Sequence, residues 1–133
     1  MPGMFRIELA PYQAEPMNSV MDQSVQSVVL MWASQTGKTE IINNIIGYHI
    51  DLDPSPILCL QPTLEIATSW STDRLSPMVR DTPVLKKLVA DPKARDSGNT
   101  KLHKKFMGGH ITIAGANSPA SLAARPIRVV LCD

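Results

Sequence analysis

The stretch VVLMWASQTGKTEIINNII, residues 28–46, decides the fold of this chain. Its apolar beginning predicts a buried strand, its polar middle a short loop, and its isoleucine-rich end an amphipathic helix. This order is typical of a phosphate-binding loop, in which backbone N–H groups and the positive end of a helix dipole surround an anion. The tripeptide Gly37-Lys38-Thr39 stands where such a loop meets its helix.

The residue types of the loop match the chemistry of nucleotide phosphates. The backbone around the phosphates would come from Ser34, Gln35, Thr36 and Gly37. Lys38 would neutralise the β- and γ-phosphates, and Thr39 would bind Mg²⁺ through its hydroxyl. The strict motif asks for glycine where this chain has Trp32, so the loop must begin in strand geometry and turn later. The alternative is a strand, loop and helix with an accidental GKT.

Length and composition place the chain among globular proteins. Its 133 residues suffice for one domain with a core. No apolar run approaches the roughly 20 residues that a membrane span needs, and the first residues break their apolar character too early for a secretory signal. We therefore expect a cytosolic protein that does not associate with a membrane. Cys59 and Cys132 lie in apolar runs without a zinc pattern, which predicts that both are buried in the core.

A local excess of positive charge interrupts a chain whose formal net charge is only +1. A DNA-contacting surface and an ordinary solvated face both explain such a segment, and the second is the more common case. Its basic residues are Arg80, Lys86, Lys87, Lys93, Arg95, Lys101, Lys104 and Lys105.

Hydrophobic spacing predicts an alternation of helices and strands. The expected elements of the first half are a short helix within residues 14–28, a strand over 26–32, a helix from Thr39 to about Asp51 and a strand over 57–61. Thr63 is the expected N-cap of a helix that runs from Leu64 past Trp70.

The second half predicts a short helix, a hairpin and a final strand. The helix covers 83–90, a polar loop follows over 91–100, and Gly108-Gly109 turns a hairpin with strands over 101–107 and 110–114. A turn of helix over 120–124 precedes a buried strand over 128–132. The predicted fold class is α/β, a P-loop NTPase three-layer sandwich with a mainly parallel sheet.

Asp133 completes the predicted site, because it stands at the carboxyl end of the apolar strand RVVLC. A carboxylate there would hold the hydration shell of Mg²⁺ opposite the phosphate loop. We expect the strand that carries Asp133 to lie beside the strand that leads into the loop.

Several stretches together resemble the ATPase domain of the large terminase subunit of tailed bacteriophages, in its lambda-like GpA branch. They are PYQ (11–13), ASQTGKTE (33–40), QPT (61–63) with Trp70 after it, SPMVRDTP (76–83) and GANSPASLAARPIRVVLCD (115–133). The resemblance implies an ATP- and Mg²⁺-dependent motor in the host cytoplasm that packages double-stranded DNA. Its implied partners are a small terminase subunit, the portal of the procapsid and further copies in a ring.

The resemblance also implies roles for single residues. Gln13 corresponds to a glutamine that reads adenine, and its alternative is a polar residue that begins a surface helix. Many terminases carry an arginine in the loop, where this chain has Ser34-Gln35-Thr36. Arg125 is a candidate for reaching the phosphate of a neighbouring subunit, and a local ion pair explains it equally well.

In the family, a glutamate directly after the aspartate polarises the attacking water, whereas this sequence stops at Asp133. We therefore interpret the chain as an N-terminal part of a longer ATPase, truncated after the Walker B strand and lacking the nuclease domain. A helicase-like DNA translocase and a non-catalytic nucleotide-binding remnant are the alternative functions.

Overall fold

A computed structural model of the chain describes residues 5–89, 99–117 and 126–133. The chain divides into two compact units, Met1–Ile45 and Ile46–Asp133. Helix α2 (Lys38–Asp51) begins in the first unit and ends in the second. We describe each unit by itself.

The N-terminal unit consists of short helical segments, an extended segment and the start of α2. Two 3₁₀ turns, η1 (Ile7–Leu9) and η2 (Pro11–Gln13), lead directly into helix α1 (Ala14–Ser19). The short helix predicted within residues 14–28 therefore forms over residues 14–19. Helix α2 starts one residue before the predicted position, and its isoleucines at 41, 42, 45, 46 and 50 are all buried, as their spacing predicts.

The predicted strand over residues 26–32 is wrong, because this segment has no regular structure. Its side chains are largely exposed: Val29 is 84% and Met31 is 94% accessible to solvent. A strand exists only where another strand pairs with its N–H and C=O groups, and no such partner lies alongside this segment in the described residues. The segment is apolar, as a buried strand would be, but apolar composition does not determine whether a segment pairs with another strand.

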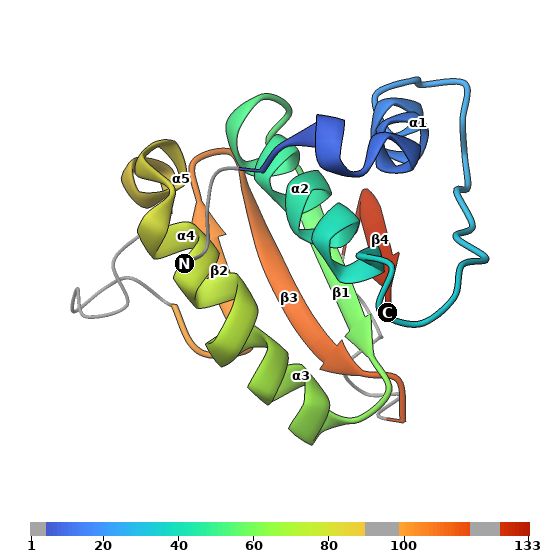
Figure 1. The fold of residues 1–133 in the computed structure, drawn as a ribbon. Helices are drawn as coiled ribbons and strands as arrows, with labels where there is room; N and C mark the ends of the chain where they lie inside the picture. Colours follow the sequence, from blue (N-terminus) through green and yellow to red (C-terminus); the bar gives the residue numbers. More distant parts are fainter. Residues whose placement is uncertain (1–4, 90–98, 118–125) are drawn as a thin grey trace. The chain divides into compact units, whose positions relative to one another are not determined.

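The C-terminal unit is built on a four-stranded sheet in the order β2-β3-β1-β4 (Figure 1). Its strands are β1 (Pro56–Gln61), β2 (His103–Phe106), β3 (Gly109–Gly115) and β4 (Val129–Cys132). Strand β1 pairs in parallel with β3 and β4, and β2 pairs with β3 in the antiparallel direction. The unit is therefore α/β with a mixed sheet, and the three strand regions predicted around residues 57, 110 and 129 are confirmed.

One face of the sheet forms the core of this unit. Cys59 aligns with Ile113 on one side and with Leu131 on the other, and all three are buried. The other face is less covered at its β4 end, where Val130 is 54% exposed.

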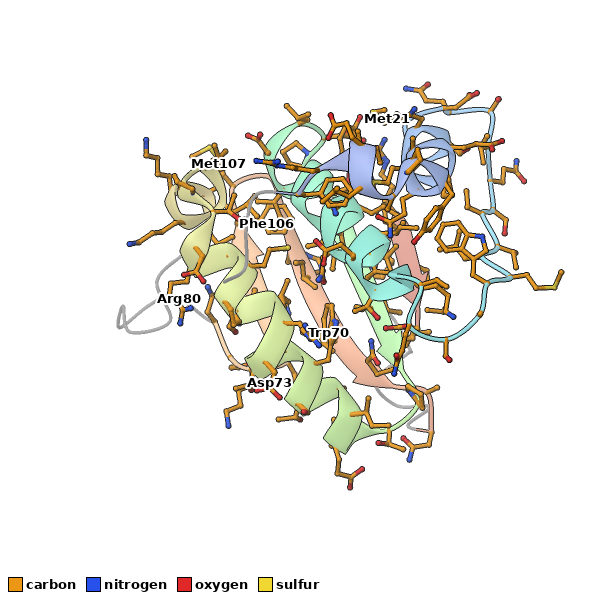
Figure 2. All side chains as sticks on the ribbon, viewed as in Figure 1. Met21, Trp70, Asp73, Arg80, Phe106 and Met107 are labelled. Carbon is orange, nitrogen blue, oxygen red and sulfur yellow. The ribbon has the colours of Figure 1, made fainter. Side chains whose placement is uncertain are left out.

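The helices beside this sheet follow one another in a nearly continuous helical segment over residues 64–88. Helix α3 (Leu64–Trp70) packs against β3 and β1. A π-helical turn, η3 (Ser71–Leu75), joins it to α4 (Ser76–Asp81), and α5 (Pro83–Leu88) follows. The predicted N-cap is confirmed, because the Thr63 hydroxyl accepts a hydrogen bond from Ile66 N at 3.3 Å. Trp70 lies toward β3 in Figure 2, whereas Asp73 and Arg80 are exposed to solvent.

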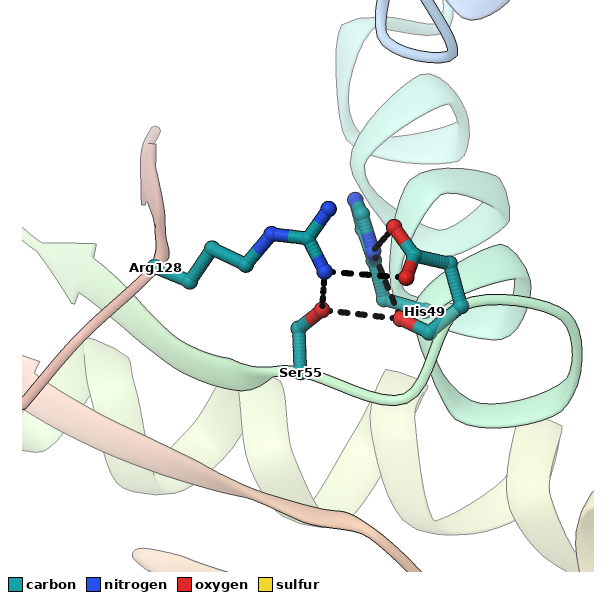
Figure 3. A network of polar contacts seen from close by, with 4 residues as sticks. His49, Ser55 and Arg128 are labelled. Carbon is teal, nitrogen blue, oxygen red and sulfur yellow. Dashed lines mark hydrogen bonds and ion pairs between the residues drawn. The ribbon is translucent and has the colours of Figure 1, made fainter. Parts of the chain in front are cut away.

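A polar network holds the start of β4 at the start of β1 (Figure 3). The Arg128 guanidinium donates from Nη1 to Asp53 Oδ1 and to Ser55 Oγ, both at 2.9 Å. Ser55 Oγ donates to the Asp53 carbonyl at 2.8 Å, and His49 Nδ1 lies 3.1 Å from the same oxygen. The Arg128 backbone N–H donates to Pro56 O, so main chain and side chain fix the same register.

The hairpin turns one residue earlier than the sequence predicts, at Met107-Gly108 instead of Gly108-Gly109. Gly108 has a φ of +85°, a conformation that glycine adopts at no steric cost. A Cβ at this position would lie 2.8 Å from Pro54 Cβ, so the turn also packs too closely for a side chain.

Two glycines in this unit should respond oppositely to alanine. We expect Gly108→Ala to lower the free energy of unfolding by at least about 1–2 kcal/mol, because it forces a left-handed conformation and a clash with Pro54. Gly47→Ala should raise it by up to about 1 kcal/mol, since Gly47 is inside α2 and the new methyl would meet Leu85 Cδ1 at an ordinary 3.8 Å. Urea unfolding of the variants measures both effects. Equal shifts of the same sign would contradict the turn geometry.

Candidate functional site

The loop between residue 32 and α2 turns through two left-handed residues. Gln35 has a φ of +58° and Gly37 one of +83°. The loop therefore starts in ordinary geometry at Trp32 and bends later, as the missing first glycine predicts. Glu40 and Ile41 both donate their backbone N–H to Gly37 O, so Gly37 is the residue directly before α2 that accepts the first hydrogen bonds of the helix.

The Lys38 side chain folds back and hydrogen-bonds to the backbone of the loop that precedes it. Its ammonium donates to the carbonyl of Ala33 at 2.8 Å and to that of Trp32 at 3.1 Å. The Thr36 hydroxyl donates to the same Ala33 oxygen at 2.8 Å. The charged end of Lys38 thus lies over the loop backbone, in a position where the oxygens of an anion would replace carbonyl oxygens as its partners.

Tyr12 and Gln13 hold the loop from the preceding helical turn. Both donate to the Thr36 carbonyl, Tyr12 from its hydroxyl at 3.1 Å and Gln13 from Nε2 at 3.3 Å. Gln13 is 4% exposed, and a Cβ on Gly37 would lie 2.3 Å from its Nε2. The second glycine of the motif is therefore needed for this contact as well as for its backbone conformation.

Gln13 keeps one unused hydrogen-bonding atom. Its Oε1 is buried and has no partner among the described residues. A buried amide oxygen without a donor is costly, so a ligand that supplies an N–H would be favoured here. Gln13 directly precedes the exposed helix α1, as its alternative reading has it, but its own side chain is buried. Nε2 donates one of its two hydrogens to Thr36 O, and Oε1 is the atom that would accept from such a ligand.

A shallow pocket opens beside the loop. It has a volume of about 370 Å³ and is lined by Tyr12, Trp32, Ala33 and Thr36. The rings of Tyr12 and Trp32 meet edge to face, with centroids 5.1 Å apart. Sequence reasoning did not select Tyr12 as a site residue, because a single tyrosine in PYQ carries no spacing signal. The two rings supply flat apolar surface of the kind that planar ligands contact.

Asp133 lies at the carboxyl end of the parallel strands, where α/β sheets commonly bind ligands. Its N–H donates to Leu60 O at 3.1 Å, which continues the β1–β4 ladder by one residue. Its side chain is exposed. Next to it, β1 ends at Gln61, which is 3% exposed and whose Nε2 has no hydrogen-bond partner in the described part of the chain.

The two cysteines differ, contrary to the prediction that both are buried. Cys59 lies in the central strand β1, and burial raises the pKa of its thiol to about 12. Cys132 is exposed, because β4 is at the edge of the sheet and Cys132 is on its less covered face. Apolar neighbours in the sequence could not distinguish a central strand from an edge strand.

Some other predicted features lie outside the described residues, and the residues of the basic segment differ from one another in pairing and burial. Arg125, the turn of helix over 120–124 and most of the polar loop over 91–100 fall outside the described ranges. In the basic segment, Arg80 pairs with Asp81 at 2.6 Å, and Lys104 is buried, which lowers its pKa. Lys86, Lys87, Lys101 and Lys105 are exposed.

No group of three or more histidine, cysteine, aspartate or glutamate side chains in the described residues is placed to hold a metal ion. No helix in those residues has the length and apolar character that crossing a membrane requires.

Comparison with known proteins gave one match. The family model of the phage terminase large subunit gpA, ATPase domain, matches residues 1–133. No curated protein and no solved structure matched the chain.

The contrast between the thiols predicts selective labelling. At pH 8 we expect a disulfide reagent to modify Cys132 and to leave Cys59 unmodified, because the thiolate is the reactive species and Cys59 is both buried and protonated at that pH. Cys132→Ser should then take up reagent only after unfolding. Mass spectrometry of the native protein counts the modified sites, and two modified thiols in the folded chain would contradict the placement of Cys59.

Proposed function

Because the chain belongs to the ATPase-domain family of the phage terminase large subunit gpA, we propose that it forms the ATP-binding part of a DNA-packaging motor. Membership of the family implies a role in phage DNA packaging and ATPase activity of the full-length protein. The finer proposal concerns the residues that bind the nucleotide. The observation that supports it most is Lys38, whose ammonium lies inside the loop on the Trp32 and Ala33 carbonyls.

The phosphates would bind to the loop over residues 34–39. Backbone N–H groups at the start of α2 would face the anion, and Lys38 would exchange its carbonyl partners for β- and γ-phosphate oxygens. The exchange would involve the lysine side chain, and the Lys38 backbone is the first residue of α2. Ser34, Gln35, Thr36 and Gly37 would contribute backbone, in the turn that Gln35 and Gly37 create.

The base would bind beside Gln13. Adenine carries an exocyclic N–H₂ group, which can donate to the unpaired Oε1 of Gln13, whereas guanine has a carbonyl at the corresponding position. The pocket at Tyr12 and Trp32 would take the flat face of the base. This arrangement favours ATP over GTP as the nucleotide.

Magnesium would be held by Thr39 and Asp133. A hydroxyl and a carboxylate are oxygen ligands of the kind that Mg²⁺ prefers, and Asp133 is exposed to solvent. When bound, the ion would neutralise charge on the β- and γ-phosphates. Hydrolysis would require a further residue after Asp133 to orient water for attack on the γ-phosphorus, with ADP as leaving group.

We propose the binding partners of this chain from its family. They are double-stranded DNA, a small terminase subunit, the portal of the procapsid and further copies of the chain in a ring. Arg125 would act on the phosphate of a neighbouring subunit, and the motor would work in the host cytoplasm. The chain would be the N-terminal part of a P-loop three-layer ATPase core, with the rest of the core and a nuclease domain following it.

Substitution of Lys38 tests the phosphate loop. We expect Lys38→Ala to abolish ATP binding in the full-length protein, since no other cation of the described loop can take its place. Lys87→Ala is the control, because Lys87 is an exposed lysine of α5 and its loss should leave binding unchanged. A fluorescent ATP analogue measures both affinities. Retained affinity and hydrolysis in Lys38→Ala would refute the assignment.

Gln13→Ala tests the reading of the base. It removes the acceptor for the adenine amino group, so the preference for ATP over GTP should fall by about tenfold, the equivalent of one lost hydrogen bond of about 1.4 kcal/mol. GTP affinity itself should change little. Competition with both nucleotides measures the ratio. Equal losses for ATP and GTP would mean that Gln13 acts only through Thr36 and Gly37.

Hydrolysis of ATP by residues 1–133 tests whether a residue beyond Asp133 is needed for turnover. We expect a polypeptide of residues 1–133 to bind nucleotide without hydrolysing it, because the proposed water-orienting glutamate would follow Asp133 and so lie outside these residues. A longer version with glutamate directly after Asp133 and the remaining strands should hydrolyse ATP at least about 100-fold faster. Steady-state phosphate release measures both. Turnover of the short chain within about tenfold of the longer one, lost on Lys38→Ala, would place the base elsewhere.

A further inference from the structure

Exposed lysines gather at the β2 end of the sheet in the C-terminal unit. Helix α5 contributes two of them and the chain at strand β2 contributes two more. Alternation along β2 turns Lys104 and Phe106 into the core and leaves the residue between them outside. The exposed side chains, together called the basic edge, are Lys86, Lys87, Lys101 and Lys105.

A short antiparallel bridge brings the two halves of the basic edge together. Val89, which directly follows α5, pairs with Phe106, the last residue of β2. Lys87 and Lys105 each lie within two residues of this bridge. Figure 2 shows the same arrangement, with Met107 at the tip of the hairpin beside α5. Lysines from separate parts of the sequence therefore form one surface.

The segments that form the basic edge contain no acidic residue where the structure describes them. Residues 82–89 and 99–117 include five lysines, with the buried Lys104 among them, and no aspartate or glutamate. In the sequence, residues 90–98 carry two charges of each sign and so leave this excess unchanged. Asp81, shortly before α5, accepts two hydrogen bonds from the Arg80 guanidinium, at 2.6 and 2.8 Å. These segments therefore carry a net positive charge at neutral pH.

This surface suits duplex DNA better than a single strand. Proteins that bind single strands combine positive charge with exposed aromatic rings, on which the bases stack. Phe106 is the one phenylalanine, tyrosine or tryptophan in the described segments, and it is only 7% exposed. Duplex DNA keeps its bases stacked and presents a phosphate for about every 1.7 Å of its axis. Lysines on this surface would therefore contact phosphates, and such contacts carry no sequence information.

We propose that the basic edge binds the phosphate backbone of double-stranded DNA, independently of base sequence. The choice of DNA rests on the proposed packaging function, whereas the charge pattern does not. Each lysine that reaches a phosphate releases a counterion, so four contacts would give the plot of log affinity against log salt a slope of about −3.6. Binding of this kind holds any sequence equally, as packaging of a whole genome requires.

Salt-dependent DNA binding tests the proposal. Fluorescence anisotropy of a labelled duplex, with the full-length protein between about 50 and 200 mM salt, measures affinity and slope. Each lysine of the basic edge is replaced by glutamine in turn. Every replacement should make the slope less steep by about 0.9 and weaken binding several-fold, equally for two unrelated sequences. Lys105→Arg keeps the charge and should retain both values. Arg6→Gln removes an exposed cation of the N-terminal unit and should change neither.

Unchanged slopes in all four glutamine variants would overturn the proposal, as would losses confined to one DNA sequence. Lysines beside a sheet edge can also prevent aggregation. Variants that aggregate but bind DNA with the parent slope would assign the lysines that role instead. Circular dichroism confirms folding, and the fluorescent ATP analogue is measured on the same proteins. Retained ATP binding with unchanged DNA slopes would refute the basic edge alone, whereas a parent protein that binds neither ligand would refute the proposed function.

Discussion

The backbone hydrogen bonds of β1 are the interaction on which the C-terminal unit depends. This strand pairs in parallel on both sides, with β3 and with β4, and its residues Ile57 and Cys59 are completely buried. A buried strand must satisfy all its N–H and C=O groups, so the positions of its two neighbours are fixed together. The register then determines where functional groups stand, since the last bond of the β1–β4 ladder is made by the N–H of Asp133 itself.

Patterns that depend on nearby residues were predictable from the sequence. The stripe of isoleucines gave α2, the Thr63 cap gave the start of α3, and short β-branched runs gave the strands around residues 57, 110 and 129. Features that depend on distant partners were not predictable. Residues 26–32 have the composition of a strand without its pairing, and Cys132 is apolar in sequence context yet exposed at a sheet edge.

In the candidate site, too, features set by nearby residues were predictable and features set by distant contacts were not. The glycine and lysine of the loop were selected from their spacing; in the structure Gly37 has a positive φ and the Lys38 ammonium donates to the Ala33 carbonyl. The contacts that stabilise the loop were not visible in the sequence, because Tyr12 and Gln13 act on Thr36 from more than 20 residues away. Gly37 has two reasons to be glycine, its positive φ and the Gln13 amide against its Cα, and only the first belongs to the motif.

The bonds of Lys38 to the loop carbonyls also have a thermodynamic consequence. In the proposed nucleotide complex, a phosphate would have to replace the Trp32 and Ala33 oxygens that already accept hydrogen bonds from the ammonium. The heat released on binding would then include the loss of these charge-assisted hydrogen bonds, and it would be smaller than the number of new contacts would indicate. Calorimetric enthalpies of nucleotides with this loop would consequently understate the interaction between lysine and phosphate.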